Sequence, residues 1–284
     1  MFMPRQIVEE KLLAFLSEDI GEGDVSVAAV IPENLMIMAD VIVKEAGVIA
    51  GIKEALILAE CLGLKAEPKV ADGCKVKNKQ VLLSLAGDAQ TILTVERTLL
   101  NLLSRMSGIA TKTHILVEQL KKTNPALRLA ATRKSAPGLL YFDKKAVIIG
   151  GGDPHRLHLD DMILIKDNHL AITGSVEKAV KNAKANASFS KKIEVEVTCI
   201  EDALSATAAG ADIIMLDNFS PKQAKEATQK LRRAGYDKVL IEVSGGITLN
   251  NLSEYATVDI DIISMGELTH SVRALDISLE ITKK

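Results

Sequence analysis

The sequence predicts an α/β protein: an incomplete (β/α) barrel joined to an N-terminal α+β domain. Beyond Pro125, short apolar runs alternate with Ala-, Lys- and Glu-rich stretches of helical spacing, a pattern typical of parallel strands linked by helices. Before residue 100 the order is less regular, with short β-type runs on both sides of an apolar helix. About seven strand–helix units favour a barrel. An open doubly wound sheet is the alternative.

The first hundred residues read as a small mixed domain. A helix is expected at 8–16 and a turn-rich loop at 17–24, because Gly and acidic residues cluster there. Apolar periodicity then gives short strands and one helix, which we place at 35–43, 69–70 and 81–85 for the strands and 52–62 for the helix. Residues 91–120 have helical spacing, and Gly108 predicts a break.

The rest of the chain supplies the barrel. Strands are expected at 127–131, 146–149, 162–165, 193–197, 213–216, 239–243 and 260–265, and helices at stretches such as 176–187 and 221–234. Residues 274–281 alternate like a strand that returns to the N-terminal domain. We therefore place an N-terminal α+β domain at 1–108, joined by a C-terminal strand at 273–284, and a catalytic barrel at 109–272.

Composition excludes several classes of function. The formal net charge is -2, aromatic residues make up 3% and Trp is absent, so neither the basic surface nor the stacking platform of a nucleic-acid-binding protein is expected. No stretch is long and apolar enough for a membrane span, and residues 1–11 lack the apolar core of a signal peptide. Three scattered cysteines indicate reduced packing residues. We expect a cytoplasmic protein.

Cationic side chains gather between residues 131 and 169, at strand ends or in a glycine-rich loop: Arg133, Lys134, His155, Arg156 and Lys166. In a barrel these ends form the site, so the pattern indicates a multiply charged anionic ligand. The loop at 150–156 matches neither the Walker nor the dinucleotide-binding glycine pattern.

Two carboxylates, Glu196 and Asp217, close successive strands, and Glu194 points the same way as Glu196. Carboxylates beside phosphate groups are the ligands that Mg²⁺ prefers. The simpler alternative is a structural ion pair with Lys166 or Lys134.

Glycines follow the last two strands, in Ser244-Gly245-Gly246 and in Met265-Gly266, and His270 lies nearby. Such loops let phosphate approach backbone N–H groups, although turn geometry alone also favours glycine there.

At this point the motifs resemble one family. The segments that carry the resemblance are Thr-Arg-Lys-Ser-Ala-Pro-Gly, Gly-Gly-Gly-x-x-His-Arg, Leu-Ile-Lys-Asp-Asn-His, Glu-Val-Glu-Val, Met-Leu-Asp-Asn-Phe, Ser-Gly-Gly-Ile and Met-Gly-x-Leu-Thr-His-Ser. In this order they resemble quinolinate phosphoribosyltransferases, with the type II phosphoribosyltransferase fold. The family usually has Arg where Leu140 stands, and Asp where Thr198 stands.

The resemblance implies transfer of phosphoribosyl from phosphoribosyl pyrophosphate to quinolinate, with decarboxylation, in NAD biosynthesis. It implies Mg²⁺ as cofactor and a homodimer or higher homo-oligomer with a shared active site, to which one subunit lends Arg97. It also implies a role for each site residue: quinolinate held by Arg133, His155, Arg156 and Lys166; Lys134 between the two substrates; ribose and Mg²⁺ held by Glu196 and Asp217; and phosphate held by Ser244, Gly245, Gly246, Gly266 and His270.

Three alternatives remain at this stage. A sister enzyme would act on nicotinate or a related acid, which needs fewer cations. A carrier module is indicated only by the rhythm of residues 72–82, where no modifiable lysine motif is found. A barrel with Schiff-base chemistry would need Lys166 with a lowered pKa.

Overall fold

The computed structural model describes residues 3–283 and divides into two compact units. The first, here the N-terminal unit, contains residues 3–114, 141–151 and 272–283; the second, the barrel unit, contains residues 115–140 and 152–271. Within the described residues no helix is both long enough and apolar enough to cross a membrane.

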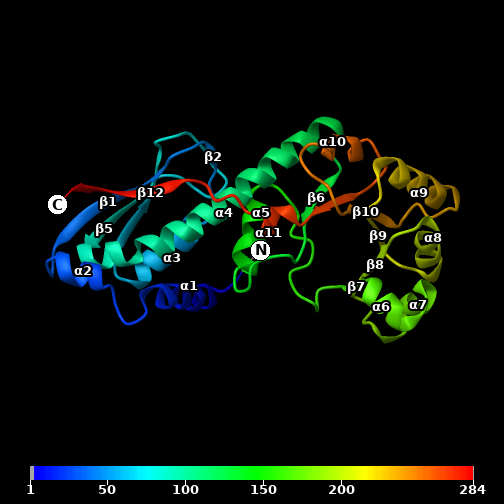
Figure 1. The fold of residues 1–284 in the computed structure, drawn as a ribbon, viewed down its shortest axis with the longest axis horizontal. Coiled ribbons are helices and arrows are strands. Elements are labelled where there is room, and N and C mark those ends of the chain that lie inside the picture. Colours follow the sequence, from blue (N-terminus) through cyan, green and yellow to red (C-terminus); the bar gives the residue numbers. More distant parts are fainter. Residues whose placement is uncertain (1–2, 284) are drawn as a thin grey trace. The chain divides into compact units, whose positions relative to one another are not determined.

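A four-stranded antiparallel sheet of order β12-β1-β5-β3 organises the N-terminal unit (Figure 1). Its strands are β1 (Met36–Val43), β3 (Lys65–Pro68), β5 (Val81–Asp88) and β12 (Ile277–Lys283), and a separate pair joins β2 (Gly47–Val48) to β4 (Lys75–Val76). The helices of this unit are α1 (Arg5–Ile20), α2 (Val25–Val30), α3 (Ile52–Cys61), α5 (Leu140–Ile149) and the first part of α4 (Ala89–Thr123). Helix α3 packs on β3 and β5, and α1 packs on α3.

Strand β12 confirms the expected return of the chain. It pairs antiparallel with β1, and alternate residues of β1 such as Ala39, Val41 and Val43 are fully buried. The expected helices at 8–16 and 52–62 are also confirmed by α1 and α3. The strand expected at 69–70 lies instead four residues earlier, in β3.

The predicted break at Gly108 is wrong, because α4 runs through it without interruption. A Cβ at Gly108 would lie 2.1 Å from the carbonyl oxygen of Arg273. Glycine is therefore required by close approach of the returning chain and not by the geometry of the helix.

Six parallel strands of order β6-β11-β10-β9-β8-β7 form the barrel unit. They are β6 (Arg128–Ala131), β7 (Ile163–Ile165), β8 (Ile193–Val197), β9 (Ile213–Asp217), β10 (Leu240–Ser244) and β11 (Ile262–Met265). The helices are α6 (Asp167–Thr173), α7 (Val176–Asn186), α8 (Ile200–Ala209), α9 (Pro221–Arg233), α10 (Leu252–Tyr255) and α11 (Glu267–His270). The order is open between β6 and β7, which confirms that the chain combines an incomplete barrel with an α+β unit.

One strand expected in the barrel is a helix. Residues 146–149 end α5, which belongs to the N-terminal unit. The apolar run is explained by burial: Phe142, Ala146 and Val147 are fully buried in that unit. The boundary expected between residues 108 and 109 stays a prediction.

Local sequence fixes the helices that cover the sheet. Helices α7, α8 and α9 follow one another in space along the outside of the strands (Figure 1). Helix α9 begins with a capping box, in which Ser220 Oγ accepts from the Gln223 backbone N–H and the Gln223 side chain accepts from the Ser220 N–H, with Pro221 in the first turn. This cap fixes the start of α9 a few residues after the end of β9.

Candidate active site

The carboxyl ends of the six barrel strands surround a cavity of about 550 Å³. Most of the residues expected in the site line it, namely Arg133, Lys134, His155, Arg156, Lys166, Glu196, Asp217, Ser244, Gly245 and Gly246. Leu164 and Met215 supply apolar wall. Two site residues predicted from sequence, Gly266 and His270, lie beside the cavity, and Arg97 belongs to the other unit.

Strand register explains why these side chains converge. Glu196 is aligned with Met215, which is in turn aligned with Glu242, and all three line the cavity. Two residues further along, Asp217 is aligned with Ser244. Because alternate residues of a strand share a face, these pairs form successive layers inside the barrel.

A loop carries His155 into the cavity. Backbone bonds from Asp153 to Leu129 and Ala131 extend the edge of β6, and the Asp153 carboxylate accepts the His155 N–H at 2.7 Å. His155 itself has φ 55°, in the left-handed region that non-glycine residues rarely occupy. The loop therefore holds His155 in a conformation that it would not adopt on its own.

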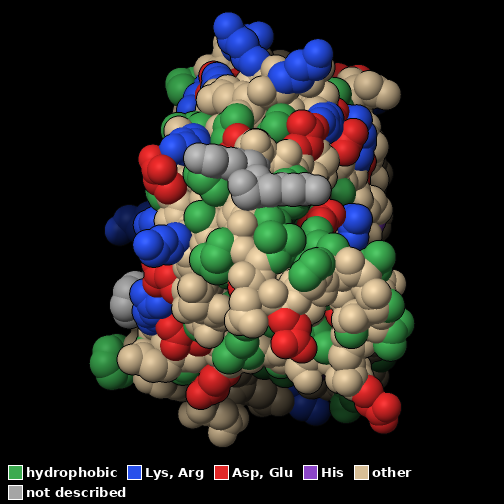
Figure 2. Space-filling model, turned by 90° about the vertical axis from the view of Figure 1, so that its left-hand side faces the viewer, with side chains coloured by type: hydrophobic (Ala, Val, Ile, Leu, Met, Phe, Trp, Pro, Cys, Tyr) green, Lys and Arg blue, Asp and Glu red, His purple; other side chains and the backbone are tan. Residues whose placement is uncertain are grey.

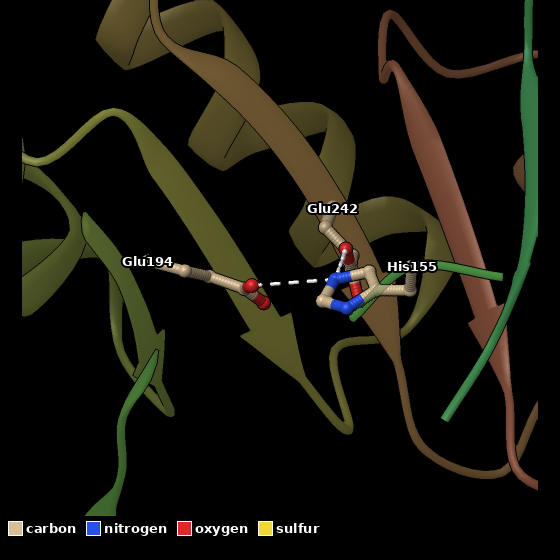
Figure 3. Close-up of side chains that lie close together, drawn as sticks. All are labelled: His155, Glu194 and Glu242. Carbon is tan, nitrogen blue, oxygen red and sulfur yellow. Dashed lines mark hydrogen bonds and ion pairs between the residues drawn. The ribbon is translucent and has the colours of Figure 1, made fainter. Parts of the chain in front are cut away.

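His155 lies between two buried glutamates from different strands, Glu194 and Glu242 (Figure 3). Its Nε2 hydrogen-bonds Glu242 Oε2 at 3.1 Å and lies 3.3 Å from Glu194 Oε2 as an ion pair. Burial lowers the pKa of His155, but its two glutamate partners outweigh burial and raise that pKa to about 10. His155 is therefore a cation at neutral pH.

Burial and the nearby Glu242 raise the pKa of Glu194, while His155 opposes the shift. Sequence reasoning placed Glu194 on the interior face and missed Glu242. The available signal was one acidic residue within the apolar run Leu-Ile-Glu-Val, since a lone charge in a buried strand needs a partner.

Further cationic side chains, those of Arg133, Lys134 and Arg156, also line the cavity. Burial, followed by repulsion from Arg133, lowers the pKa of the Arg156 guanidinium. Arg133 and Lys134 follow β6 and remain solvent-exposed. Two like charges held this close favour an anion between them.

Lys166 donates to Glu196 Oε2 at 2.9 Å, so the ion pair considered as the simpler alternative does form. His169 fixes the start of α6 by accepting the Lys166 backbone N–H on Nδ1 at 2.9 Å. Burial and then repulsion from Glu196 raise the pKa of Asp217, against the Asn218 amide that donates to it at 2.7 Å. A divalent cation would relieve that repulsion, so the donor set fits Mg²⁺.

The glycine loops permit close backbone approaches. A Cβ on Gly245 would lie 2.3 Å from Asn218 Oδ1, and Gly245 and Gly246 both have positive φ. Gly266 leaves room for His270 and Lys134, to which a Cβ there would come within 3.2 Å. Thr269 anchors the same corner by donating to the Lys134 carbonyl at 2.7 Å.

Several known proteins are similar to this chain in sequence and in fold. A relative from Methanothermobacter thermautotrophicus, described as a probable carboxylating nicotinate-nucleotide pyrophosphorylase, is 44% identical over 93% of this chain and 95% of its own. The carboxylating nicotinate-nucleotide pyrophosphorylase of Mycobacterium leprae is 40% identical over 94% of both chains. The crystal structure of NadC from Streptococcus pyogenes superposes with a TM-score of 0.92 at 36% identity, covering 100% of this chain and 99% of that one.

Two family models together span most of the chain. The N-terminal domain of quinolinate phosphoribosyl transferase matches residues 24–107, and its C-terminal domain matches residues 109–280. With the relatives and the shared fold, these matches show that the chain belongs to the quinolinate phosphoribosyltransferase family.

Proposed function

We propose that this protein transfers the phosphoribosyl group of phosphoribosyl pyrophosphate to quinolinate, releasing pyrophosphate and CO₂ and forming nicotinate mononucleotide. One observation carries the proposal: five cationic side chains, three carboxylates and a glycine loop line a single cavity. A pyridine with two carboxylates and a sugar with five-fold phosphate charge both need cations, and one cavity supplies them. The names of the relatives support the same reaction.

Quinolinate would lie against the cationic residues of the cavity. Arg133 and Arg156 have the planar fork that matches a carboxylate, and repulsion from Arg133 lowers the pKa of Arg156. His155 and Lys166 add positive charge to the cavity lining. Such a set orients the ring so that its nitrogen faces the sugar.

The sugar would lie toward the carboxylates. Glu196 and Asp217 are placed to stabilise the positive charge that grows on the ribose ring as pyrophosphate departs. Glu196 and Asp217 would hold Mg²⁺, and the ion would supply charge neutralisation for the leaving pyrophosphate. Lys134 lines the cavity and its side chain also lies against Gly266, which suits a group that contacts both substrates. The phosphates would be held by Ser244, Gly245, Gly246, Gly266 and His270.

The proposed transfer and decarboxylation need no further cofactor, because every bond that breaks is matched by a stable product or leaving group. The ring nitrogen attacks the anomeric carbon, the C–O bond to pyrophosphate breaks, and the nitrogen becomes a pyridinium. The adjacent C–CO₂⁻ bond breaks next, CO₂ leaves, and its electron pair stays on the ring carbon, stabilised by the charged nitrogen. That carbon finally takes a proton from water.

We also propose that the active enzyme is a cytoplasmic homodimer or larger homo-oligomer in which Arg97 completes the partner's site. Arg97 is exposed on α4. Apolar side chains of the N-terminal unit are also exposed, Val25 at 81% and Val30 at 72%. Figure 2 shows hydrophobic side chains gathered among charged ones over one face of the molecule. Apolar area of this kind favours contact between copies.

The decisive test incubates the protein with Mg²⁺, phosphoribosyl pyrophosphate and carboxyl-labelled quinolinate, and measures labelled CO₂ and pyrophosphate together. We expect equal amounts of both. Nicotinate in place of quinolinate is the control for the sister-enzyme alternative: pyrophosphate release with nicotinate and none with quinolinate would overturn the proposal. For the shared site, mixing inactive Arg97→Ala and Lys134→Ala variants should restore partial activity, which separate cis sites would not allow.

A further inference from the structure

Glu194 and Glu242 are two carboxylates that the proposed reaction does not use. Both side chains are completely buried, on β8 and β10. Glu242 lines the cavity directly. Two negative charges at a site that binds anions need an explanation, because their electrostatic repulsion would by itself weaken the binding of a diacid.

Their contacts meet at a single atom. Nε2 of His155 lies 3.1 Å from Glu242 Oε2 and 3.3 Å from Glu194 Oε2, with the glutamates approaching from two strands (Figure 3). The remaining oxygen of Glu242 and both oxygens of Glu194 have no hydrogen bond within the described residues. The ring is therefore held on both sides of Nε2, and its rotation is restricted.

The other ring nitrogen is the one left for a ligand. Nδ1 of His155 has no hydrogen-bond partner among residues 3–283, while the His155 backbone N–H is held by Asp153. His155 lines the cavity with 10% of its side chain exposed. An imidazolium fixed at Nε2 presents its Nδ1–H in one direction.

We propose that Glu194 and Glu242 are positioning residues that clamp the His155 ring between them, so that Nδ1–H donates a hydrogen bond to a carboxylate of the acid substrate. The inference rests on the proposed function, because it deepens the recognition of the same acid. If the glutamates acted only by electrostatic repulsion, removing one of them would strengthen the binding of the negatively charged substrate. The clamp predicts the opposite, namely that removing either negative charge weakens this binding.

Glu194→Gln and Glu242→Gln test this sign, since each keeps the size of the side chain and removes its charge. Each should raise the KM for quinolinate roughly 10-fold, and the double variant about 100-fold, in line with the loss of hydrogen bonds to a charged group. The KM for phosphoribosyl pyrophosphate should change less than about two-fold, because the clamp does not touch the carboxylates on the sugar side.

Glu54→Gln is the matched control. Glu54 is 1% exposed and pairs with Lys145 at 2.5 Å in the N-terminal unit, so it repeats the same chemical change away from the barrel cavity. We expect it to lower the unfolding midpoint without changing the KM for quinolinate. A lower KM in either cavity variant, or equal changes in both substrates, would overturn the clamp.

A spectroscopic readout separates the clamp from the reaction. ¹⁵N shifts of ring-labelled histidine, assigned with His155→Gln, should show a doubly protonated His155 ring at neutral pH in the wild type and a neutral one in the double variant. Turnover of quinolinate with an unchanged KM in the double variant rejects the clamp alone. A wild-type protein that shows the ring signature and binds quinolinate by calorimetry, yet releases no CO₂, rejects the proposed function alone.

The same three residues have ligand atoms within 4.8 Å of one another, which also suits a transition-metal ion. Titration with Zn²⁺ and Mn²⁺ alone distinguishes the cases. Stoichiometric binding that both Glu→Gln variants abolish would overturn the clamp, because a metal would then occupy Nε2. Absence of such binding, with the ring signature above, supports it.

Discussion

Two buried ionic clusters, one in each unit, are built in opposite ways. In the N-terminal unit, Arg105 donates from Nε and Nη2 to the two oxygens of Asp143 at 2.7 and 2.8 Å. In the barrel unit, two glutamates share one nitrogen of His155, and three of their four oxygens lack hydrogen bonds in the described structure. The first cluster is complete by itself. The second has more acceptors than donors.

The difference separates a structural role from a functional one. A bidentate pair fulfils the requirement that a buried charge be matched, and nothing more is needed from a ligand. A cluster with surplus carboxylate charge is costly to bury, and the cost is explained when the cluster holds a cation in place for the substrate. In the same cavity, two arginines also carry like charges without neutralising each other, and repulsion from Arg133 lowers the pKa of Arg156.

The largest effect is expected from breaking the complete pair. Arg105→Ala should lower the free energy of unfolding by about 3–5 kcal/mol, because it removes the bidentate pair that Arg105 makes with buried Asp143. Urea denaturation followed by circular dichroism measures it. The joint replacement Arg105→Met with Asp143→Leu should recover most of the loss, and an equal loss in both would show that packing, not charge, dominates.

On the barrel side, Asp217→Asn should reduce kcat about 10²- to 10³-fold with little change in stability, because it removes charge stabilisation that matters only as pyrophosphate leaves. Initial rates of pyrophosphate release at saturating substrates give the value, and thermal melting gives the control. A variant that melts normally but keeps full kcat would place Asp217 outside the chemistry.

Arg133→Ala should raise the Kd for quinolinate about 10- to 1000-fold, since truncating one partner of a charge pair costs roughly 2–4 kcal/mol. Isothermal calorimetry with quinolinate alone reads this out. Arg233→Ala on α9 removes an exposed arginine outside the cavity and should leave binding unchanged. Unaltered affinity in the Arg133 variant would remove that side chain from the acid site.

The smallest effect concerns pH. Because the folded protein raises the pKa of His155 from 6.5 to about 10, the folded state binds a proton that the unfolded state releases between these values. Its stabilising contribution is complete below 6.5, declines through that window and is lost above about 10. Quinolinate binding depends on the protonation of His155 in the folded protein. It should stay constant from about pH 7 to 9, where the ring keeps its proton, and weaken as the pH approaches 10. In His155→Gln this weakening should shrink, and an unchanged pH profile would show that His155 does not bind the acid.

The sequence predicted the strands of the barrel and most cavity residues, since alternating apolar runs and charges at their ends are local signals. It mistook residues 146–149 for a strand because a buried helix end and a buried strand share an apolar run, and only tertiary packing separates them. It read Gly108 as a helix break because the carbonyl of Arg273 that demands the glycine lies far along the chain.

Glu242 was missed for a related reason. Its proposed role depends on contacts with His155, which lies on a loop, and on the neighbouring Glu194 of another strand. No spacing of residues along the chain predicts these contacts. The Lys166–Glu196 pair was anticipated only as an alternative to a metal site. The two interpretations are compatible, because a carboxylate can accept a hydrogen bond on one oxygen and coordinate a metal ion with the other.

The order in which the chain is made gives β12 an unusual place. It covers the edge of β1, yet every residue of the barrel lies between the two strands in the sequence. During translation the N-terminal sheet cannot be completed until the entire barrel has left the ribosome, because β1 remains unpaired on one side until β12 is made. An uncovered strand edge invites mispairing, so nascent chains stalled before β12 are the species that chaperones would need to shield.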